Sequence, residues 1–446
     1  MKKTISAILL LTAILIILLS CLRNDHPQTV PKKYPADVAI AWIDMQRKLF
    51  VGTHGLLPHV TGRACAYMGY TMYESIVPGM HGYQSIASQL NGGLALPGIE
   101  PGRQYHWPAS ANAALAFMLK NLLPHTTPQL LHSVDSLEAS FYNQFQMEAD
   151  VEELQRSADF GRQIAMAIFE WSKTDGGHEA YKNPFAEDYV PPTGPGKWVS
   201  TGEFPFTQPV YPYWGNNRTF IPGLADATQP APPPAYSENP GSDFYNAVNE
   251  IYTLSQSLSH EDSLTAKFWA YELLTPDEAR QFEDGSHAAN ISTQIIVLKK
   301  LSLQDAAVLY CKQGIAANDA GISCVKTKFH YNLVRPITYI RNVLGHSEWL
   351  PVVPTPPFPE YTSAHAAISM ASAAVLEETF GKDFPFTDHS FDDTYGPRHF
   401  DSFEAYAKEA ALSRLQAGIH YRFSMDEGLK QGRKVAAMVN QLKFKK

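Results

Sequence analysis

Apolar residues recur at helical spacing along most of the chain, and this periodicity constrains the fold more than any other feature. It gives each helix one apolar stripe, and such stripes are buried by packing helices together. The apolar–polar alternation that is typical of strands is scarce. The sequence therefore predicts an all-α fold built as a helical bundle, with helices over 36–50, 61–77, 108–122, 128–148, 150–174, 241–258, 261–273, 286–301, 303–319, 363–380, 402–417 and 424–441.

One long segment, residues 176–240, breaks this pattern because it is rich in Pro, Gly and aromatic residues. Long irregular segments inside a compact domain are usually functional loops or lids. The other interpretation is that the segment wraps one face of the bundle, with Trp198, Tyr213 and Trp214 as anchors. We favour the wrapping segment.

The N-terminus has the form of a targeting signal. Two lysines precede an apolar run over 8–19, which is too short to favour a membrane span and ends at "LLSC". This resembles a bacterial lipoprotein signal, which implies a signal peptide over 1–20, lipidation of Cys21, a tether over 21–35 and a single domain over 36–446. The expected location is the bacterial cell envelope, with membrane contact through the lipid anchor only. Plain secretion with cleavage elsewhere is the alternative.

Composition excludes one class of partner. The 446 residues carry a formal net charge of −8 without a basic block, so no nucleic acid partner is expected, because binding a phosphate backbone needs clustered Lys and Arg. The sequence carries no signal for an oligomeric state. Beside Cys21 the chain has Cys65, Cys311 and Cys324, and these allow either a Cys311–Cys324 disulfide or buried free thiols, of which we favour the thiols.

Two short stretches place polar side chains where an anion could bind. Lys328 and Arg335 are seven residues apart, which puts two cations on nearly the same face if both are helical. Thr362 or Ser363 is a natural N-cap for the helix that follows, whose first N–H groups and positive dipole end favour an anion. Ala364 is small enough for an oxyanion to approach the backbone, and His365 lies in the first turn.

A third stretch adds another cation and another imidazole. Arg414 comes near the end of a predicted helix that Gly418 can stop, and Ser424 to Glu427 has the capping-box form that begins the next helix. His420 then falls in the connection. Together the three stretches give cations, a hydroxyl, a helix N-terminus and two histidines, which suit acyl or phosphoryl transfer or an oxyanion cofactor.

The same stretches resemble the signature of the vanadium-dependent haloperoxidase / type-2 phosphatidic acid phosphatase (PAP2) superfamily. Its pattern is K-x6-R-P, then P-S-G-H, then S-R-x5-H-x3-D. This chain has K-x6-R-P from Lys328, T-S-A-H from Thr362 and S-R-x5-H from Ser413. The resemblance covers roughly 36–446 and is strong over the core motif region, 326–428. It implies a helical-bundle domain of the vanadium chloroperoxidase / acid phosphatase type.

The resemblance also implies the role of each site residue. His365 would be the acid–base group, and His420 would be either the vanadium ligand or the phosphorylated nucleophile of a phosphatase. The oxyanion, vanadate or phosphate, would be bound by Lys328, Arg335, Ser363, the Ala364 N–H and Arg414.

The chain departs from the superfamily pattern at four positions. Thr362 replaces Pro and should spare the chemistry, whereas Ala364 replaces Gly and adds a methyl group beside the oxyanion. Ser424 replaces the final Asp and removes a partner that could orient His420, a function that Asp426 is placed to take over. Val325 stands where many relatives have Trp.

Flanking residues favour one activity. The stretch "PPFPEYTSAHA" resembles the haloperoxidase version of the motif, and Phe358 falls where chloroperoxidases carry Phe, although ordinary packing would also account for it. The implied reaction is oxidation of halide by hydrogen peroxide with vanadate as cofactor. One alternative is a phosphatase that hydrolyses phosphate esters and needs no cofactor. A second is a non-catalytic surface lipoprotein that binds glycans or a protein partner.

Overall fold

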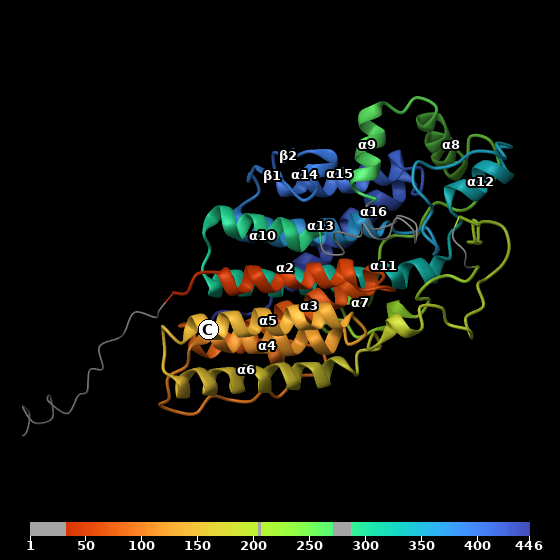
Figure 1. Cartoon of the computed structure of the whole chain (residues 1–446). Coiled ribbons are helices and arrows are strands. Elements are labelled where there is room, and N and C mark those ends of the chain that lie inside the picture. Colours follow the sequence, from red (N-terminus) through yellow and green to blue (C-terminus); the bar gives the residue numbers. More distant parts are fainter. Residues whose placement is uncertain (1–32, 204–206, 271–286) are drawn as a thin grey trace, which may run out of the picture. The chain divides into compact units, whose positions relative to one another are not determined.

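The computed structural model describes residues 33–203, 207–270 and 287–446, and Tyr34–Lys446 forms one compact unit (Figure 1). Helices make up most of the regular structure of this unit, so the predicted all-α bundle is confirmed. Its longer helices are α2 (Asp37–Gly52), α3 (Pro58–Ile76), α4 (Trp107–Leu122), α5 (Pro128–Phe145), α6 (Val151–Ser172), α8 (Asp243–Ser255), α9 (His260–Phe268), α10 (His287–Lys299), α11 (Leu303–Tyr331), α12 (Pro336–Asn342), α13 (Ala364–Phe380), α15 (Phe403–Gln416) and α16 (Arg422–Val439).

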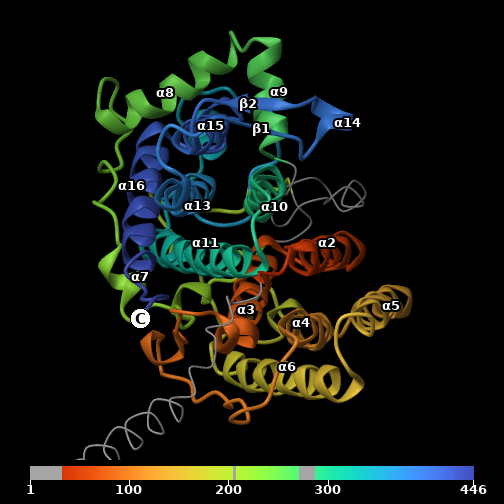
Figure 2. The same cartoon turned by 90° about the vertical axis from the view of Figure 1, so that its left-hand side faces the viewer.

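Helix α11 lies at the centre of the bundle. It packs against α3 on one side and against α13 and α16 on the other (Figure 2). The contact with α3 is close because Gly69 has no side chain, and a Cβ added there would lie 2.4 Å from the Tyr310 carbonyl oxygen. The central helix therefore joins the N-terminal helices to the C-terminal ones that carry the motif residues.

Two predicted helix boundaries are wrong in ways that affect the site. Helix α11 continues past the predicted end at 319 to Tyr331, where Asn332 adopts a left-handed conformation with φ of 47°. Helix α16 begins at Arg422 with Tyr421 as N-cap, so Ser424 lies inside the first turn and does not cap the helix. Parts of two other predictions, 271–273 and residue 286, lie outside the described residues.

The structure also contains a short hairpin that periodicity did not predict. Strands β1 (Phe386–Asp388) and β2 (Arg398–Phe400) pair antiparallel, with Phe386 opposite Phe400. Three residues are too few for an alternation pattern to stand out, which explains why the hairpin was missed. The short helix α14 (Asp392–Tyr395) lies between the two strands.

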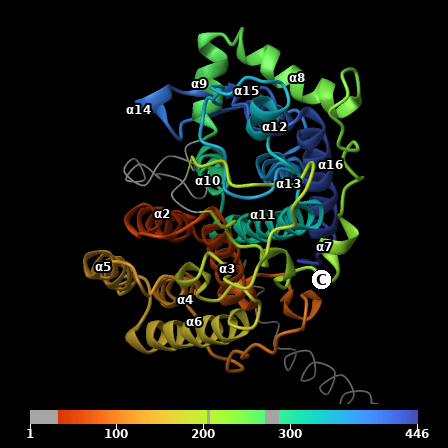
Figure 3. The ribbon, with the colours of Figure 1, turned by 90° about the vertical axis from the view of Figure 1, so that its right-hand side faces the viewer.

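The Pro- and aromatic-rich segment 176–240 is mostly irregular, as predicted, with short helices η3 (Ala180–Lys182), η4 (Trp214–Asn216) and α7 (Leu224–Ala227). It runs past the C-terminal end of α11 (Figure 3), where the Trp198 N–H donates to the Asn332 carbonyl and the Val334 N–H to the Gly196 carbonyl. Trp198 and Trp214 are buried, but Tyr213 is 43% exposed, so its predicted role as an anchor is wrong.

The remaining sequence predictions have mixed outcomes. Cys65, Cys311 and Cys324 are all free thiols, so the disulfide interpretation is wrong. Cys21 and the whole predicted signal and most of the tether lie outside the described residues. Among the described helices, none combines the length and hydrophobicity needed to cross a bilayer.

Candidate active site

The turn between α11 and α12 brings the first two cations together. Lys328 lies in the last turn of α11, and its carbonyl accepts the Asn332 N–H that ends the helix. Arg335 is the N-cap of α12, with Pro336 in the first helical position. The prediction that the two cations share one helix face is therefore wrong. Helix α11 ends between them, and both side chains are buried, with Lys328 1% and Arg335 0% exposed.

Main-chain carbonyls hold both cations in place. The Lys328 ammonium donates to the carbonyls of Pro359 (3.2 Å), Glu360 (2.8 Å) and Thr362 (2.5 Å). Arg335 donates through Nε to the Phe358 carbonyl and through Nη1 to the Ile419 carbonyl, each at 2.9 Å. The segment that precedes α13 therefore wraps around the two cations.

Burial makes these charges costly. It lowers the pKa of Lys328 to about 8, with a smaller effect from the positive charge of Arg335. Burial likewise lowers the pKa of Arg335 to about 10, and the Arg335 Nη2 atom is buried without a hydrogen-bond partner among the described residues. A buried guanidinium with an unused donor is suited to binding an anion.

The N-terminus of α13 is held beside the cations by α16. Ser363 is the N-cap, its N–H donates to the Ser424 carbonyl at 3.1 Å, and its hydroxyl accepts the Ala366 N–H at 3.4 Å. Thr362, which replaces the family's Pro, donates to the Gln431 side chain at 2.6 Å. The first N–H groups of α13, including that of Ala364, have no acceptor within their own helix.

His420 lies between Arg335 and a carboxylate, Glu360, that the sequence did not point to. Its Nδ1 lies 2.7 Å from Glu360 Oε1, which also accepts the Tyr421 N–H at 2.9 Å. Its Nε2 lies 3.3 Å from Arg335 Nη1. Because Glu360 accepts from Nδ1, the lone pair of the neutral ring is on Nε2, the nitrogen beside Arg335. Asp426, the substitute orienter considered from the sequence, is exposed.

The pKa values of this pair shift in opposite directions. Burial, followed by the positive charge of Arg335, lowers the pKa of His420 well below its ordinary value. Burial raises the pKa of Glu360 to about 7, against the opposing effects of Arg335 and Lys328. His420 is therefore a neutral imidazole near pH 7, which is the form that binds a metal centre.

The third cation comes from the other side of α13. Arg414 in α15 is fully buried, and it donates through Nη2 to the Ala266 carbonyl at 2.8 Å and through Nε to the Ser413 hydroxyl at 3.0 Å. Its positive charge is the second cause, after burial, of a pKa of His365 that lies well below the ordinary value. Arg414 and His365 therefore lie near each other.

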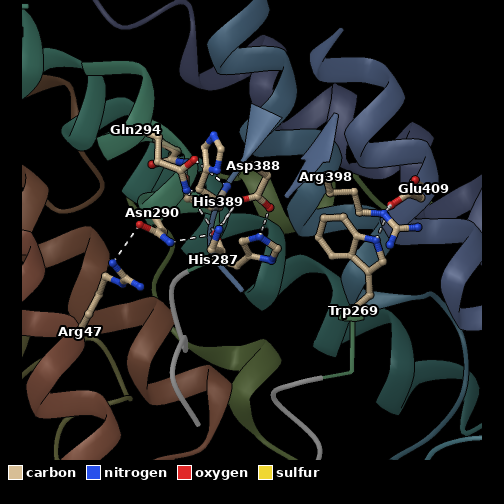
Figure 4. A network of polar contacts seen from close by, with 12 residues as sticks. Arg47, Trp269, His287, Asn290, Gln294, Asp388, His389, Arg398 and Glu409 are labelled. Atoms are coloured by element: carbon tan, nitrogen blue, oxygen red, sulfur yellow. Dashed lines mark hydrogen bonds and ion pairs between the residues drawn. The ribbon is translucent and has the colours of Figure 1, made fainter. Parts of the chain in front are cut away.

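A hydrogen bond to the main chain of Trp269 positions His365, and polar and aromatic contacts in turn hold the Trp269 side chain. The half-buried His365 ring hydrogen-bonds to the main chain of Trp269. The Trp269 indole donates to Glu409 at 3.0 Å and packs 4.9 Å from the His287 ring, which pairs with Asp388 at 2.6 Å (Figure 4). With one ring nitrogen donating to the Trp269 carbonyl, the other nitrogen of a neutral His365 can accept a proton.

Phe358 lies against both Lys328 and Arg335. Its ring centre lies 5.2 Å from Lys328 Nζ and 5.2 Å from Arg335 Cζ. The His59 ring lies nearly perpendicular to the Phe358 ring, at a centroid distance of 6.0 Å. Phe358 therefore contacts both cations and also packs against the apolar cluster that contains Tyr211 and Trp214 of segment 176–240.

These residues fit a tetrahedral oxyanion such as vanadate. The site holds three buried cations and one buried carboxylate, Glu360, so positive charge is in excess. Arg335 Nη2 is an unused buried donor, and the His420 ring presents a lone pair beside it. The N-terminus of α13 adds further donors.

Comparison with known proteins identifies the family. The model of the VCPO second helical-bundle domain matches residues 308–445. A solved structure described as the first bacterial vanadium-dependent iodoperoxidase is 31% identical, covers 92% of this chain and 97% of its own, and gives a TM-score of 0.79. The chain belongs to the vanadium-dependent haloperoxidases.

Two further members of this family share the fold at lower identity. The holo and apo structures of a bacterial vanadium-dependent chloroperoxidase are each 15% identical. Their TM-scores are 0.67 and 0.63. Each match covers 93% of this chain, and it covers 98% of the holo chain and 97% of the apo chain. No curated protein matches the chain. The haloperoxidase is thus a peroxidase-type oxidoreductase of the predicted superfamily, and these comparisons favour neither the phosphatase nor the non-catalytic alternative.

Proposed function

We propose that this haloperoxidase holds vanadate through His420 and uses hydrogen peroxide to oxidise halide, with iodide as the preferred substrate. The observation that carries the proposal is the His420 ring, which is fixed by Glu360 on one side and presents Nε2 beside Arg335 on the other. The similarity to an iodoperoxidase supports the choice of iodide. Iodide is also the most easily oxidised of the three common halides.

Each residue of the site has a distinct task in this proposal. Lys328, Arg335 and Arg414, which are all buried, balance the charge of the oxyanion, and Ser363 and the Ala364 N–H at the start of α13 add hydrogen bonds. Because these charges and dipoles are fixed and shielded from water, they act more strongly than they would in solution.

Vanadate, when bound, supplies a Lewis-acid centre at which hydrogen peroxide is polarised for attack by halide. His365 takes the peroxide proton on the ring nitrogen that does not donate to Trp269. Its lowered pKa leaves that nitrogen free near pH 7. Glu360 keeps the Nδ1 proton on His420 and thereby keeps the lone pair on Nε2.

The test is a paired assay on the purified protein. Halide oxidation is measured with vanadate and peroxide for iodide, bromide and chloride, and phosphate-ester hydrolysis is measured without vanadate. We expect oxidation, fastest with iodide, and no vanadate-free hydrolysis. Equilibrium dialysis should show vanadate retained by wild type and by His330→Ala, an exposed control, but lost in His420→Ala. Ester hydrolysis without halide oxidation would overturn the proposal.

We also propose that the mature protein is anchored in the bacterial envelope through a lipid on Cys21. The "LLSC" sequence supports this. Wild type expressed in a bacterium should fractionate with membranes and incorporate labelled fatty acid. Cys21→Ser should do neither, and equal membrane association of the two would contradict the anchor.

A further inference from the structure

A histidine from the N-terminal half of the chain lies in the wall of the active site. His59 is in the first turn of α3, and its ring contacts those of Tyr211 (5.2 Å), Trp214 (5.5 Å) and Phe358 (6.0 Å), all edge-on. These rings come from segments that lie far apart in the sequence. They form one aromatic wall, defined here as His59, Tyr211, Trp214 and Phe358.

This wall lies next to the buried cations. Phe358 contacts His59 and also lies against Lys328 and Arg335, each of which is 5.2 Å from its ring centre. Burial, followed by the positive charge of Lys328, lowers the pKa of His59 to about 4. The ring is therefore neutral near pH 7 and retains one N–H donor.

Two polar atoms of the wall are buried without a partner among the described residues. They are His59 Nδ1 and the Tyr211 hydroxyl. Buried donors that remain unpaired cost about 1–3 kcal/mol each, so such atoms usually have a ligand or an ordered water. Val210, next to Tyr211, donates its N–H to the Pro357 carbonyl at 3.1 Å, which ties the wall to the chain beside Phe358.

The chemistry of the wall suits a large, weakly hydrated anion. Ring edges carry partial positive charge, and N–H and O–H groups donate to anions. The positive charges of Lys328 and Arg335, which lie against Phe358, also attract an anion. Chloride loses more hydration free energy than iodide when it enters such surroundings, because it is the smaller ion. The wall should therefore discriminate among halides.

We propose that His59 and Tyr211 bind the halide beside Phe358 and are specificity-determining residues of this enzyme. This inference rests on the proposed function and deepens it. The His59 N–H and the Tyr211 O–H donate to the halide while vanadate and peroxide are bound by the other residues of the cavity.

The experiment measures halide binding apart from turnover. Isothermal titration calorimetry with iodide, bromide and chloride is performed on vanadate-loaded protein without peroxide, for wild type, His59→Phe, His59→Gln and Tyr211→Phe. The two Phe variants remove a donor, whereas Gln keeps one. The control is His54→Phe, at an exposed position five residues before His59.

We expect iodide to bind about tenfold more weakly to His59→Phe and to Tyr211→Phe, which corresponds to one hydrogen bond to an anion. His59→Gln should recover part of the loss, and vanadate retention and the KM for peroxide should stay unchanged in all variants. Retained vanadate also shows that each variant is folded. The preference for iodide over bromide should narrow in the Phe variants.

Two results would overturn the inference: equal iodide affinity in wild type and both Phe variants, or no iodide binding by wild type. Failure of the proposed function gives a different result. In that case wild type binds iodide and loses it in the variants, but oxidises no halide when peroxide is added. That outcome would support the halide site and reject the haloperoxidase activity.

Discussion

Glu360 is the residue on which the chemistry of His420 depends. It is fully buried, and a single carboxylate oxygen accepts from both the His420 ring and the Tyr421 N–H. Glu360 therefore orients the His420 ring, whereas the hydroxyl of Ser424, at the position of the family's final Asp, is buried without a hydrogen-bond partner among the described residues.

Replacing Glu360 should weaken vanadate binding. Glu360→Ala removes the acceptor on Nδ1, so the neutral His420 ring can carry its proton on Nε2 and lose the lone pair that faces the cavity. Loss of such an orienting partner typically reduces metal affinity 10–100-fold, and we expect a decrease of about that size in equilibrium dialysis. Glu360→Gln keeps an acceptor oxygen and should lose less. The exposed Glu348→Ala is the control, and unchanged affinity in Glu360→Ala would refute the role.

His365 should be needed for turnover and not for vanadate retention. Its proposed task is proton transfer, which contributes about 10²–10⁴-fold to a rate. His365→Ala should therefore lower kcat for iodide oxidation by about that factor, while dialysis shows vanadate retained. Wild-type kcat in the variant would exclude the acid–base role. Loss of vanadate would instead make His365 a binding residue.

At the scale of elements, the site depends on how closely α16 approaches α13. A Cβ added at Gly432 would lie 2.1 Å from the Ala367 carbonyl oxygen and 2.9 Å from the Ala371 nitrogen, both main-chain atoms. No side-chain rotation can relieve such contacts. Helix α16 also supplies the Ser424 carbonyl that accepts the Ser363 N–H, so a shift of α16 would move the N-cap of α13.

We therefore expect Gly432→Ala to lower the free energy of unfolding by about 1–3 kcal/mol and to weaken vanadate binding. Gly62→Ala is the matched control, because Gly62 is also helical but an added Cβ there meets nothing within 4 Å. It should stabilise the protein by about 0.5–1 kcal/mol through helix propensity. Urea denaturation of both variants measures the two effects. Equal stability of both would mean that α16 can shift at little cost.

The same scale explains which features the sequence could predict. Most helices were predictable because an apolar stripe is local information, and His420 was correctly placed in the connection after α15. The helix end between Lys328 and Arg335 was missed, although Asn332 and Pro336 are a usual C-cap and first helical residue. Glu360 and His59 gave no signal, because their partners lie 60 residues or more away in the sequence.

For the whole molecule, the two halves of the chain contribute different parts of the site. The C-terminal half supplies the buried cations and the two histidines of the proposed site, and its motif spacing pointed to these residues. The N-terminal half, through α3 and segment 176–240, supplies His59, Tyr211 and Trp214. The motif residues could bind an oxyanion in any superfamily member, so the parts that distinguish this enzyme lie where the sequence pattern is weakest.

Burial of ionisable groups across the molecule makes stability depend on pH in opposing ways. Burial raises the pKa values of Glu74, Asp319 and Glu360 to about 7, so the folded state binds protons that the unfolded state has released. Stability from these groups is lost as pH rises from about 4.5 to 7. Burial has the opposite effect on His59 and His365, because it lowers their pKa values. The stability that depends on these two histidines therefore falls as the pH drops below about 6.5.

Glu74→Gln separates one of these contributions from the rest. Glu74 is buried in α3 and accepts the Ile86 N–H at 3.0 Å, a hydrogen bond that the amide oxygen of Gln can also accept.

The Glu74→Gln variant cannot ionise at this position, so its stability relative to wild type should increase with pH by up to about 1.4 kcal/mol per unit between 4.5 and 7. The histidines are common to both proteins and cancel in the difference. Urea denaturation at pH 5.0 and 7.5 should show a change of about 2 kcal/mol in that difference, with exposed Glu170→Gln as the control. A difference that is the same at both pH values would mean that Glu74 ionises as readily in the folded protein as in the unfolded chain.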